Sequence, residues 1–277
     1  MVHGKPRTCT QRASLVLVCV TLHLACTRRE KAPLPPNDQL VIFAASSLRD
    51  AFNDLSTEFK QSHQNLEITL NFAGSQELRM QVEHGASFDV FASADMLQMD
   101  ALAKTAFVDN PAIFARNEPV IVVSKAHASS VHGIDDLPFA DRLILGASDV
   151  PIGRYTSKIL DNVSRKQSVD FRGRVEARVV SRELNVRQVM AKVVLGEVDA
   201  AIVYRTDTVH AVDNVLMYAI PSDVNVIAEY PIATATHAPH VQLARDWVTF
   251  VLSMKGRSTL KRHGFRTDAI TLRAEPP

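Results

Sequence analysis

Short apolar runs alternate with amphipathic segments along most of this chain. The first pair is Leu40–Ala44, a continuous apolar run, and Leu48–Ser62, where apolar residues recur at positions 48, 51, 52, 55 and 59. A continuous run of this length is typical of a strand buried on both faces, and the recurrence every three or four residues is that of a helix with one buried face. The pattern predicts a β-α unit that begins near Gln39.

The same alternation continues along the chain and predicts two series of strands and helices. The first series continues with strands at 66–72 and 88–92 and helices at 76–84 and 96–104. The second has strands at 120–124, 143–147, 177–180 and 200–204 and helices at 156–164 and 186–195. A last strand at 229–236 and one long helix at 241–263 follow. Such alternation favours mostly parallel sheets with helices on both faces.

The two series predict an α/β protein of two lobes with a ligand cleft between them. Segments 119–123 and 231–235 bracket the second series and are predicted to cross between the lobes. Lobe 1 would then comprise residues 39–118 and 232–272, and lobe 2 residues 119–231. The length of 277 residues and the 46% hydrophobic content suit two packed lobes.

The first 26 residues have the organisation of a secretory signal peptide. Three basic residues precede an apolar run at 13–25, and no acidic residue occurs before Cys26. The run is shorter than the roughly 20 residues that span a bilayer. Cys26 is a candidate lipidation site, and simple cleavage to a soluble periplasmic protein is the open alternative. Residues 27–38, which are rich in charge and proline, are predicted to form a flexible tether.

The balance of charge argues against a polyanionic partner. The chain has 31 Lys and Arg against 30 Asp and Glu, and its single Trp and four Tyr offer few surfaces for base stacking. Nucleic-acid binding needs a basic excess or aromatic platforms, so no nucleic acid is expected to bind.

Four predicted strand-to-helix turns carry the candidate chemistry. Two of them, 44–47 and 72–75, end in serines predicted to cap the next helix, and the other two are 149–153 and 184–187. Beyond the carboxyl ends of parallel strands, unpaired amide N–H groups and helix dipoles form an anion site without Lys or Arg. Tyr204, at the end of a predicted strand, adds a hydroxyl. Taken singly, each serine is explained equally by ordinary capping and the tyrosine by core packing.

Six dispersed segments resemble the periplasmic molybdate-binding proteins of ABC transporters. They are FAASSL (43–48), NFAGSQEL (71–78), FDVFASAD (88–95), DVPIGRYT (149–156), NVRQVMAKVVLGEVDAAIVYRTD (185–207) and HGF (263–265). The resemblance covers residues 39–267 and implies the two-lobed periplasmic-binding-protein fold of type II.

The resemblance also implies a set of oxyanion ligands. In that family, serine and tyrosine hydroxyls and backbone amides hold the anion, with no charged side chain and no metal. Transferred by position, the hydroxyl donors are Ser47, Ser75 and Tyr204, and the amide donors are Ile152 and Val186. Neutral donors in a dry cleft can replace the water shell of a dianion because the low dielectric strengthens each hydrogen bond.

Two positions depart from the family's usual pattern. Ile152 stands where alanine is common, and Gly74 stands where a second serine is common. Ile152 would act through its backbone, so its larger side chain is tolerable if it points away from the anion. The departure at Gly74 affects only a secondary donor. Ser46, which is next to Ser47, is the other secondary candidate.

The resemblance implies a binding protein and not an enzyme. It would capture molybdate or tungstate in the periplasm, close its lobes around the anion and deliver it to an ABC-transporter permease. Molybdenum would be bound as the oxyanion, without a cofactor, and a monomer is expected. Each unmet donor costs about 1 to 3 kcal/mol, so a cavity sized for molybdate disfavours the smaller sulfate, and tungstate is nearly the same size as molybdate.

Three alternatives remain open at this point. A binding protein for sulfate or thiosulfate, or a sensor of the same fold, would use a similar site. A serine-dependent hydrolase is disfavoured because neither Ser47 nor Ser75 lies in a G-x-S-x-G elbow. A metal site is disfavoured because His127 with His132, and His237 with His240, lack ligand spacing on one face.

Overall fold

The computed structural model describes Met1 and residues 38–63, 65–126 and 131–268. The predicted signal peptide, Cys26 and nearly all of the tether lie outside the described residues, as do His127 and the last residues assigned to lobe 1. Within the described residues, no helix combines the length and the apolar character needed to cross a membrane.

The first sheet has five strands in the order β2-β1-β3-β10-β4. Their bounds are β1 (Gln39–Ala45), β2 (Glu67–Ala73), β3 (Val90–Ala92), β4 (Val108–Asn117) and β10 (Ala228–Ala235). The first three strands are parallel, and β10 is antiparallel to both of its neighbours. One strand therefore runs against the other four, and β10 pairs within this sheet from Ala228 onward.

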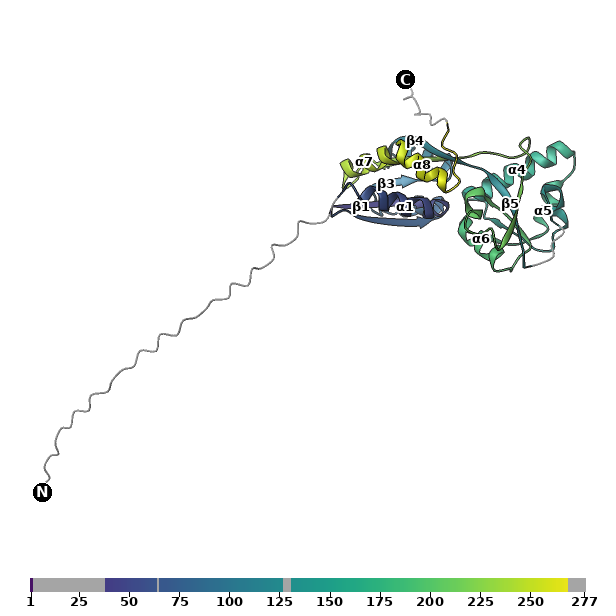
Figure 1. The fold of residues 1–277 in the computed structure, drawn as a ribbon, viewed down its shortest axis with the longest axis horizontal. Coiled ribbons are helices and arrows are strands. Elements are labelled where there is room, and N and C mark those ends of the chain that lie inside the picture. Colours follow the sequence, from purple (N-terminus) through teal and green to yellow (C-terminus); the bar gives the residue numbers. More distant parts are fainter. Residues whose placement is uncertain (2–37, 64, 127–130, 269–277) are drawn as a thin grey trace. The chain divides into compact units, whose positions relative to one another are not determined.

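Helices cover both faces of the first sheet. They are α1 (Arg49–Lys60), α2 (Ser75–Glu83), α3 (Met96–Lys104), α7 (Val241–Leu252) and α8 (Met254–Arg262), with a short 3-10 turn η1 (Ser46–Leu48) before α1. The helices α1, α7 and α8 pack together on one face (Figure 1). The helices α2 and α3 pack with each other on the other face, where they bury a separate hydrophobic cluster. The helix α1 buries Phe52 and Phe59 against Trp247, with ring centroids 5.7 and 5.4 Å apart.

The second sheet repeats this arrangement in the order β7-β6-β8-β5-β9. Its strands are β5 (Pro119–Ser124), β6 (Leu143–Gly146), β7 (Val179–Glu183), β8 (Ala200–Tyr204) and β9 (Val215–Ala219). Here β5 is the strand that runs against the others. Every residue of β5 and β8 is buried, as their continuous apolar runs predict.

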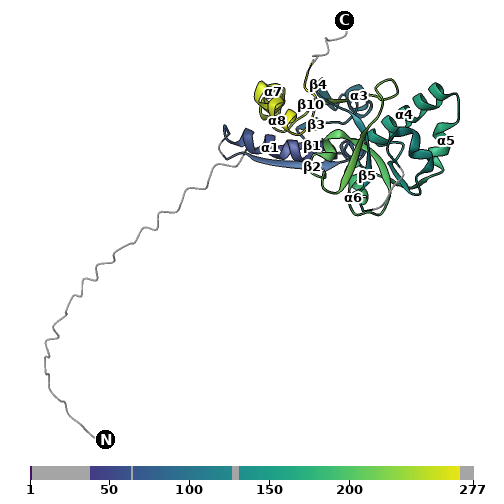
Figure 2. The same ribbon diagram turned by 45° about the vertical axis from the view of Figure 1, so that its right-hand side comes forward.

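Helices also cover both faces of the second sheet. They are α4 (Pro151–Gln167), α5 (Phe171–Glu176) and α6 (Val186–Val194), with short 3-10 segments η2 (Ile134–Phe139) and η3 (Arg205–Thr208). The helices α4 and α5 pack together, and α6 lies across the sheet from them (Figures 1 and 2). The predicted two-lobed α/β fold with mostly parallel sheets is confirmed.

Several elements differ from the prediction. The strand β4 was not predicted because its sequence contains a polar stretch and Pro111; the proline is tolerated because β4 lies at the edge of its sheet. The predicted long helix at 241–263 is two helices. Ser253 takes an extended conformation between them, and its hydroxyl accepts the Gly256 N–H at 3.2 Å as the cap of α8.

Gly153 lies where the start of α4 packs closely against the loop after β6, and its substitution tests this packing. A Cβ atom at this position would lie 1.9 Å from the Ala147 carbonyl oxygen and 2.6 Å from that of Gly146. Glycine-to-alanine changes inside helices usually stabilise by about 1 kcal/mol. We expect Gly153→Ala instead to lower the free energy of unfolding by roughly 1–3 kcal/mol, measured by urea denaturation.

The matched control is Ser157→Ala in the same helix, which should change the unfolding free energy by less than about 0.5 kcal/mol. A Gly153→Ala protein as stable as the unsubstituted one would contradict the close approach.

Candidate functional site

A small cavity lies where the carboxyl ends of the parallel strands of both sheets converge. Its empty space is about 210 Å³, part of which is open to solvent. Its lining residues are Ala45, Ser46, Ser47, Ala73, Gly74, Ser75, Ala94, Val150, Pro151, Ile152, Asn185, Val186 and Tyr204. None of these side chains is acidic or basic.

The first lobe contributes the segments after β1, β2 and β3. The turn after β1 becomes η1, and the turn after β2 becomes α2, so both helical starts point their N–H groups beyond the sheet edge. Ser47 and Ser75 are 5% and 1% exposed. Both predicted serines therefore lie in the cavity wall at helix starts.

The serines do not cap their helices, which corrects the sequence prediction. Ala45 is the cap of η1, and Gly74 is the cap of α2, with its own N–H donated to Glu77 Oε2 at 2.8 Å. Ser75 is the first residue of α2, so its hydroxyl is not occupied by a backbone N–H of its own helix. The hydroxyl is thereby left available to the cavity.

The second lobe contributes backbone donors at the starts of α4 and α6. Pro151 opens α4 and has no N–H, so Ile152 carries the first amide donor of that helix. Asn185 caps α6 by accepting the Gln188 N–H at 3.1 Å. The N–H of Val186, the first residue of α6, has no acceptor within the helix.

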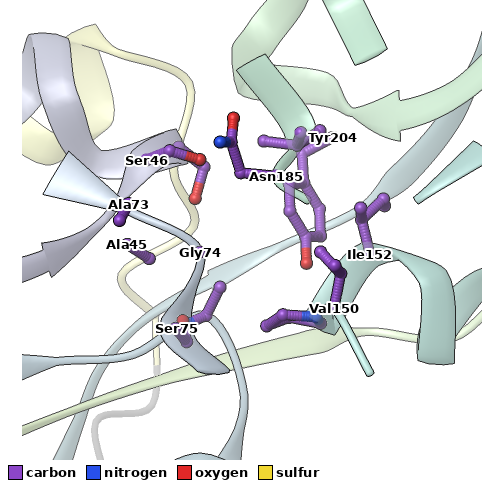
Figure 3. A pocket seen from close by; sticks show the side chains of 13 residues that line it. Ala45, Ser46, Ala73, Gly74, Ser75, Val150, Ile152, Asn185 and Tyr204 are labelled. Atoms are coloured by element: carbon purple, nitrogen blue, oxygen red, sulfur yellow. The ribbon is translucent and has the colours of Figure 1, made fainter. Parts of the chain in front are cut away.

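Tyr204, the last residue of β8, brings a hydroxyl to the same cavity. Its ring is 1% exposed, and its hydroxyl has no hydrogen-bond partner within the described chain. Figure 3 shows this hydroxyl pointing into the space between Ser75 and Ile152. Burial raises the pKa of Tyr204 well above its ordinary value, so the group remains a protonated donor.

Hydrogen bonds from the protein engage the oxygen atoms of both serines. Ser47 Oγ lies 3.0 Å from the hydroxyl of Tyr230, and Ser75 Oγ accepts the Ala94 N–H at 3.0 Å. Since a backbone N–H cannot accept a proton, the Ser75 hydroxyl proton is free to be donated to a ligand. The arrangement can bind an anion and offers no carboxylate among its lining residues to accept a proton from it.

Charged side chains lie at the rim of the cavity and pair across the lobes. Arg154 of α4 pairs with Asp95, and Arg187 of α6 pairs with Asp50 of α1. Gln76 Nε2 also donates to the Leu184 carbonyl at 2.8 Å, from α2 to the turn before α6. These contacts link the two lobes and pair both arginines with carboxylates.

The seven residues predicted as primary or secondary ligands all line this one cavity: Ser46, Ser47, Gly74, Ser75, Ile152, Val186 and Tyr204. The ion pairs at the rim and the buried Tyr230 were not predicted from the sequence. Arg154 and Arg187 lie within or next to the predicted turns, so their position was a usable signal. Among the described residues, no group of three or more His, Cys, Asp or Glu could hold a metal ion.

A cavity of neutral donors between two α/β lobes defines a binding protein for a small polar solute. The chain belongs to the family of bacterial extracellular solute-binding proteins, whose family model matches residues 40–266. It is 33% identical over 228 residues to the molybdate-binding protein ModA of Mycobacterium bovis, covering 82% of this chain and 84% of that protein. It is 27% identical over 241 residues to ModA of Escherichia coli, covering 84% and 90%.

Solved structures share the fold. The periplasmic molybdate-binding protein of Azotobacter vinelandii superimposes with a TM-score of 0.70 at 15% identity, covering 86% of this chain and 100% of that one. The sulfate-binding protein SubI of Mycobacterium tuberculosis H37Rv gives 0.74 at 17% identity, covering 83% and 87%. At such identities the likeness concerns the fold alone.

These similarities confirm three predictions made from the sequence. The resemblance to molybdate-binding proteins is confirmed by the relatives, and the family is one of binding proteins and not of enzymes. The predicted location outside the cytoplasm is confirmed at the level of the family.

The carboxyl group of Asp207 is hydrogen-bonded to the backbone of Tyr204, and the pH dependence of stability tests this interaction. Its Oδ2 accepts the Tyr204 N–H at 3.0 Å, and its Oδ1 lies 3.9 Å from Arg187 Nε. Burial raises the pKa of Asp207 from 3.8 to about 7; Arg187 and the Tyr204 N–H lower it, and Asp50 raises it. Because the folded-state pKa is raised, this group's stabilisation is complete below about pH 4 and is lost as the pH rises through 7.

We expect Asp207→Asn to remove this pH dependence. Relative to the variant, the unsubstituted protein should lose roughly 4 kcal/mol of unfolding free energy between about pH 4 and about pH 8, measured by urea denaturation. Parallel pH profiles for the two proteins would show that the pKa of the Asp207 carboxyl is not raised in the folded state.

Proposed function

We propose that this protein captures molybdate or tungstate outside the cytoplasm and delivers it to an ABC-transporter permease. The observation that carries the proposal is the cavity itself: three hydroxyls and the N–H groups of helix starts converge on it, and its lining residues include no carboxylate or cationic side chain. The relatives named for molybdate binding support the same ligand.

The proposed ligands are the hydroxyls of Ser47, Ser75 and Tyr204 and the backbone N–H groups of Ile152 and Val186. A tetrahedral dianion needs donors to four oxygens from several directions, and these five come from both lobes. Ser46 and Gly74 are secondary candidates on the same wall. Molybdate is then a ligand and not a cofactor, and molybdenum has no direct bond to the protein.

The lobes are proposed to close around the anion. The donors from the two sheets converge only if the lobes approach, and the pairs Arg154–Asp95 and Arg187–Asp50 would stabilise the approached state. The crossings lie at the β4–β5 connection near Glu118 and in the chain before Ala228. The closed form, as a monomer, is the species that we propose the permease recognises.

The periplasm is the proposed compartment, with Cys26 as a candidate lipid anchor and residues 27–38 as the tether. The signal-like composition of residues 1–26 supports export. A single acyl chain binds a membrane only weakly, so stable anchoring would require a diacylated Cys26.

Two other functions have less support. Sulfate or thiosulfate would find similar donors, but the sulfate-binding neighbour shares the fold alone. For a hydrolase, Ser47 would need a general base; its oxygen instead contacts the phenol of Tyr230, and that of Ser75 contacts a backbone amide.

Isothermal titration of the mature protein with molybdate, tungstate, sulfate and phosphate tests the ligand. We expect molybdate and tungstate to bind at least about tenfold more tightly than sulfate, since a smaller anion leaves one or more donors unmet. Phosphate should bind weakly because its proton finds no acceptor. Sulfate affinity equal to or above that of molybdate would exclude the proposed ligand.

Substitution of the serines tests the proposed ligands. Ser47→Ala and Ser75→Ala should each weaken molybdate binding about tenfold or more, because each removes a buried donor to the anion. Ser56→Ala, on α1 and outside the cavity, is the matched control and should bind like the unsubstituted protein. Full affinity in both cavity variants would show that these serines are not ligands.

A further inference from the structure

A buried chain of hydrogen bonds runs from the cavity wall to the crossing between the lobes. It links Ser47 to Tyr230 of β10, Tyr230 to Asn117 at the end of β4, and Asn117 to Thr206 of η3. The side chains of Tyr230, Asn117 and Thr206 are 0%, 1% and 7% exposed, and none of the three lines the cavity. Ser47 is thus the member of this hydrogen-bond chain that lines the cavity.

The orientation of the Asn117 amide is fixed by its backbone neighbour. Asn117 Oδ1 accepts the Glu118 N–H at 2.9 Å, so the other side of the amide is the NH₂ group. That group donates to Thr206 Oγ1 at 2.8 Å and to the Tyr230 hydroxyl at 3.4 Å. The NH₂ group of Asn117 is thus a donor to Tyr230 and cannot accept a hydrogen bond from it.

The direction of the next bond follows from burial. The Tyr230 hydroxyl has one proton and is bonded to Asn117 Nδ2, which cannot accept, and to Ser47 Oγ, which can. A phenol proton left without an acceptor at a fully buried site is unfavourable, because the group has lost its hydrogen bond to water. Tyr230 therefore donates to Ser47 at 3.0 Å, and Ser47 Oγ is the acceptor of that bond.

We propose that Tyr230, oriented by Asn117, is a positioning residue that fixes Ser47 as a hydrogen-bond donor to the bound oxyanion. With its oxygen occupied by the phenol proton, the Ser47 hydroxyl directs its own proton toward the cavity. The Ser75 hydroxyl is oriented in the same way, because its oxygen accepts the Ala94 N–H and its proton is left to be donated. The inference rests on the proposed oxyanion function and explains how two ordinary hydroxyls, each able to donate or accept, act only as donors.

The packing around Tyr230 makes a conservative substitution informative. Its ring contacts Tyr204, Phe114 and Phe265 at centroid distances of 5.8, 6.4 and 5.4 Å. Tyr230→Phe keeps this ring packing and removes only the hydroxyl, so Ser47 is left in place without the group that orients it.

A double-mutant cycle for molybdate binding tests the role. When Ser47 is unsubstituted, Tyr230→Phe should weaken molybdate binding on the order of fivefold. In the Ser47→Ala background, the same substitution should change affinity less than about twofold, because the hydroxyl that Tyr230 orients is gone. Tyr218→Phe, on β9 and away from the cavity, is the matched control and should leave affinity unchanged in both backgrounds.

Asn117→Asp provides a second variant in case Tyr230→Phe does not fold. The ionised carboxylate that this substitution introduces accepts from Tyr230, so Ser47 would turn its proton toward the phenol oxygen and away from the anion. The added negative charge weakens anion binding equally in the protein with Ser47 and in the Ser47→Ala variant. The reversed hydrogen bond between Ser47 and Tyr230 weakens anion binding only when Ser47 is present. Asn117→Asp is therefore expected to reduce molybdate affinity by a larger factor in the protein with Ser47 than in the Ser47→Ala variant.

Equal losses in the two backgrounds, for either variant, would overturn the positioning role. Absence of molybdate binding by the unsubstituted protein would instead refute the proposed function, so the two failures are distinguishable.

Discussion

The cavity between the two sheets presents hydrogen-bond donors without matching acceptors, and much of the structure around it follows from that constraint. Backbone N–H groups at helix starts have no acceptor within their helices. Ser75 Oγ accepts the Ala94 N–H, and Ser47 Oγ is hydrogen-bonded to the Tyr230 hydroxyl, which we infer to be the donor. The Tyr204 hydroxyl has no partner in the part of the protein that the structure describes. Buried donors of this kind are costly unless a ligand supplies acceptors, and a fully deprotonated oxyanion has four.

Charge is kept at the rim of this site. Arg154 and Arg187 stand within the first turns of α4 and α6, close to the proposed ligands, yet each is paired with a carboxylate of the other lobe. Unpaired, they would attract many anions without regard to shape. Paired, they connect the lobes, while recognition is left to neutral donors whose directions are fixed. Asp207 is buried, and its carboxyl group accepts the backbone N–H of Tyr204.

The fold accounts for the convergence of donors but not for the choice of ligand. In each sheet, one strand runs against the other four, so the carboxyl ends of the parallel strands and the following helix starts gather at one edge. A sulfate-binding protein superimposes on this chain as well as a molybdate-binding protein does. Selectivity must therefore arise from cavity size and from the polarity of the lining hydroxyls.

The sequence alone determined most of the strands and helices and the four turns, because those features are local, and the family resemblance supplied the seven candidate residues that line the cavity. A helix start exposes its N–H groups wherever the helix packs, and apolar runs such as those of β5 and β8 require burial on both faces. The local sequence patterns did not predict the edge strand β4 or the break at Ser253. Tertiary structure alone decided the direction of each hydroxyl: Ser47 meets Tyr230 from 183 positions away, and Tyr230 meets Asn117 across 113. A hydroxyl can donate or accept, and only the partners that folding brings to it fix which it does.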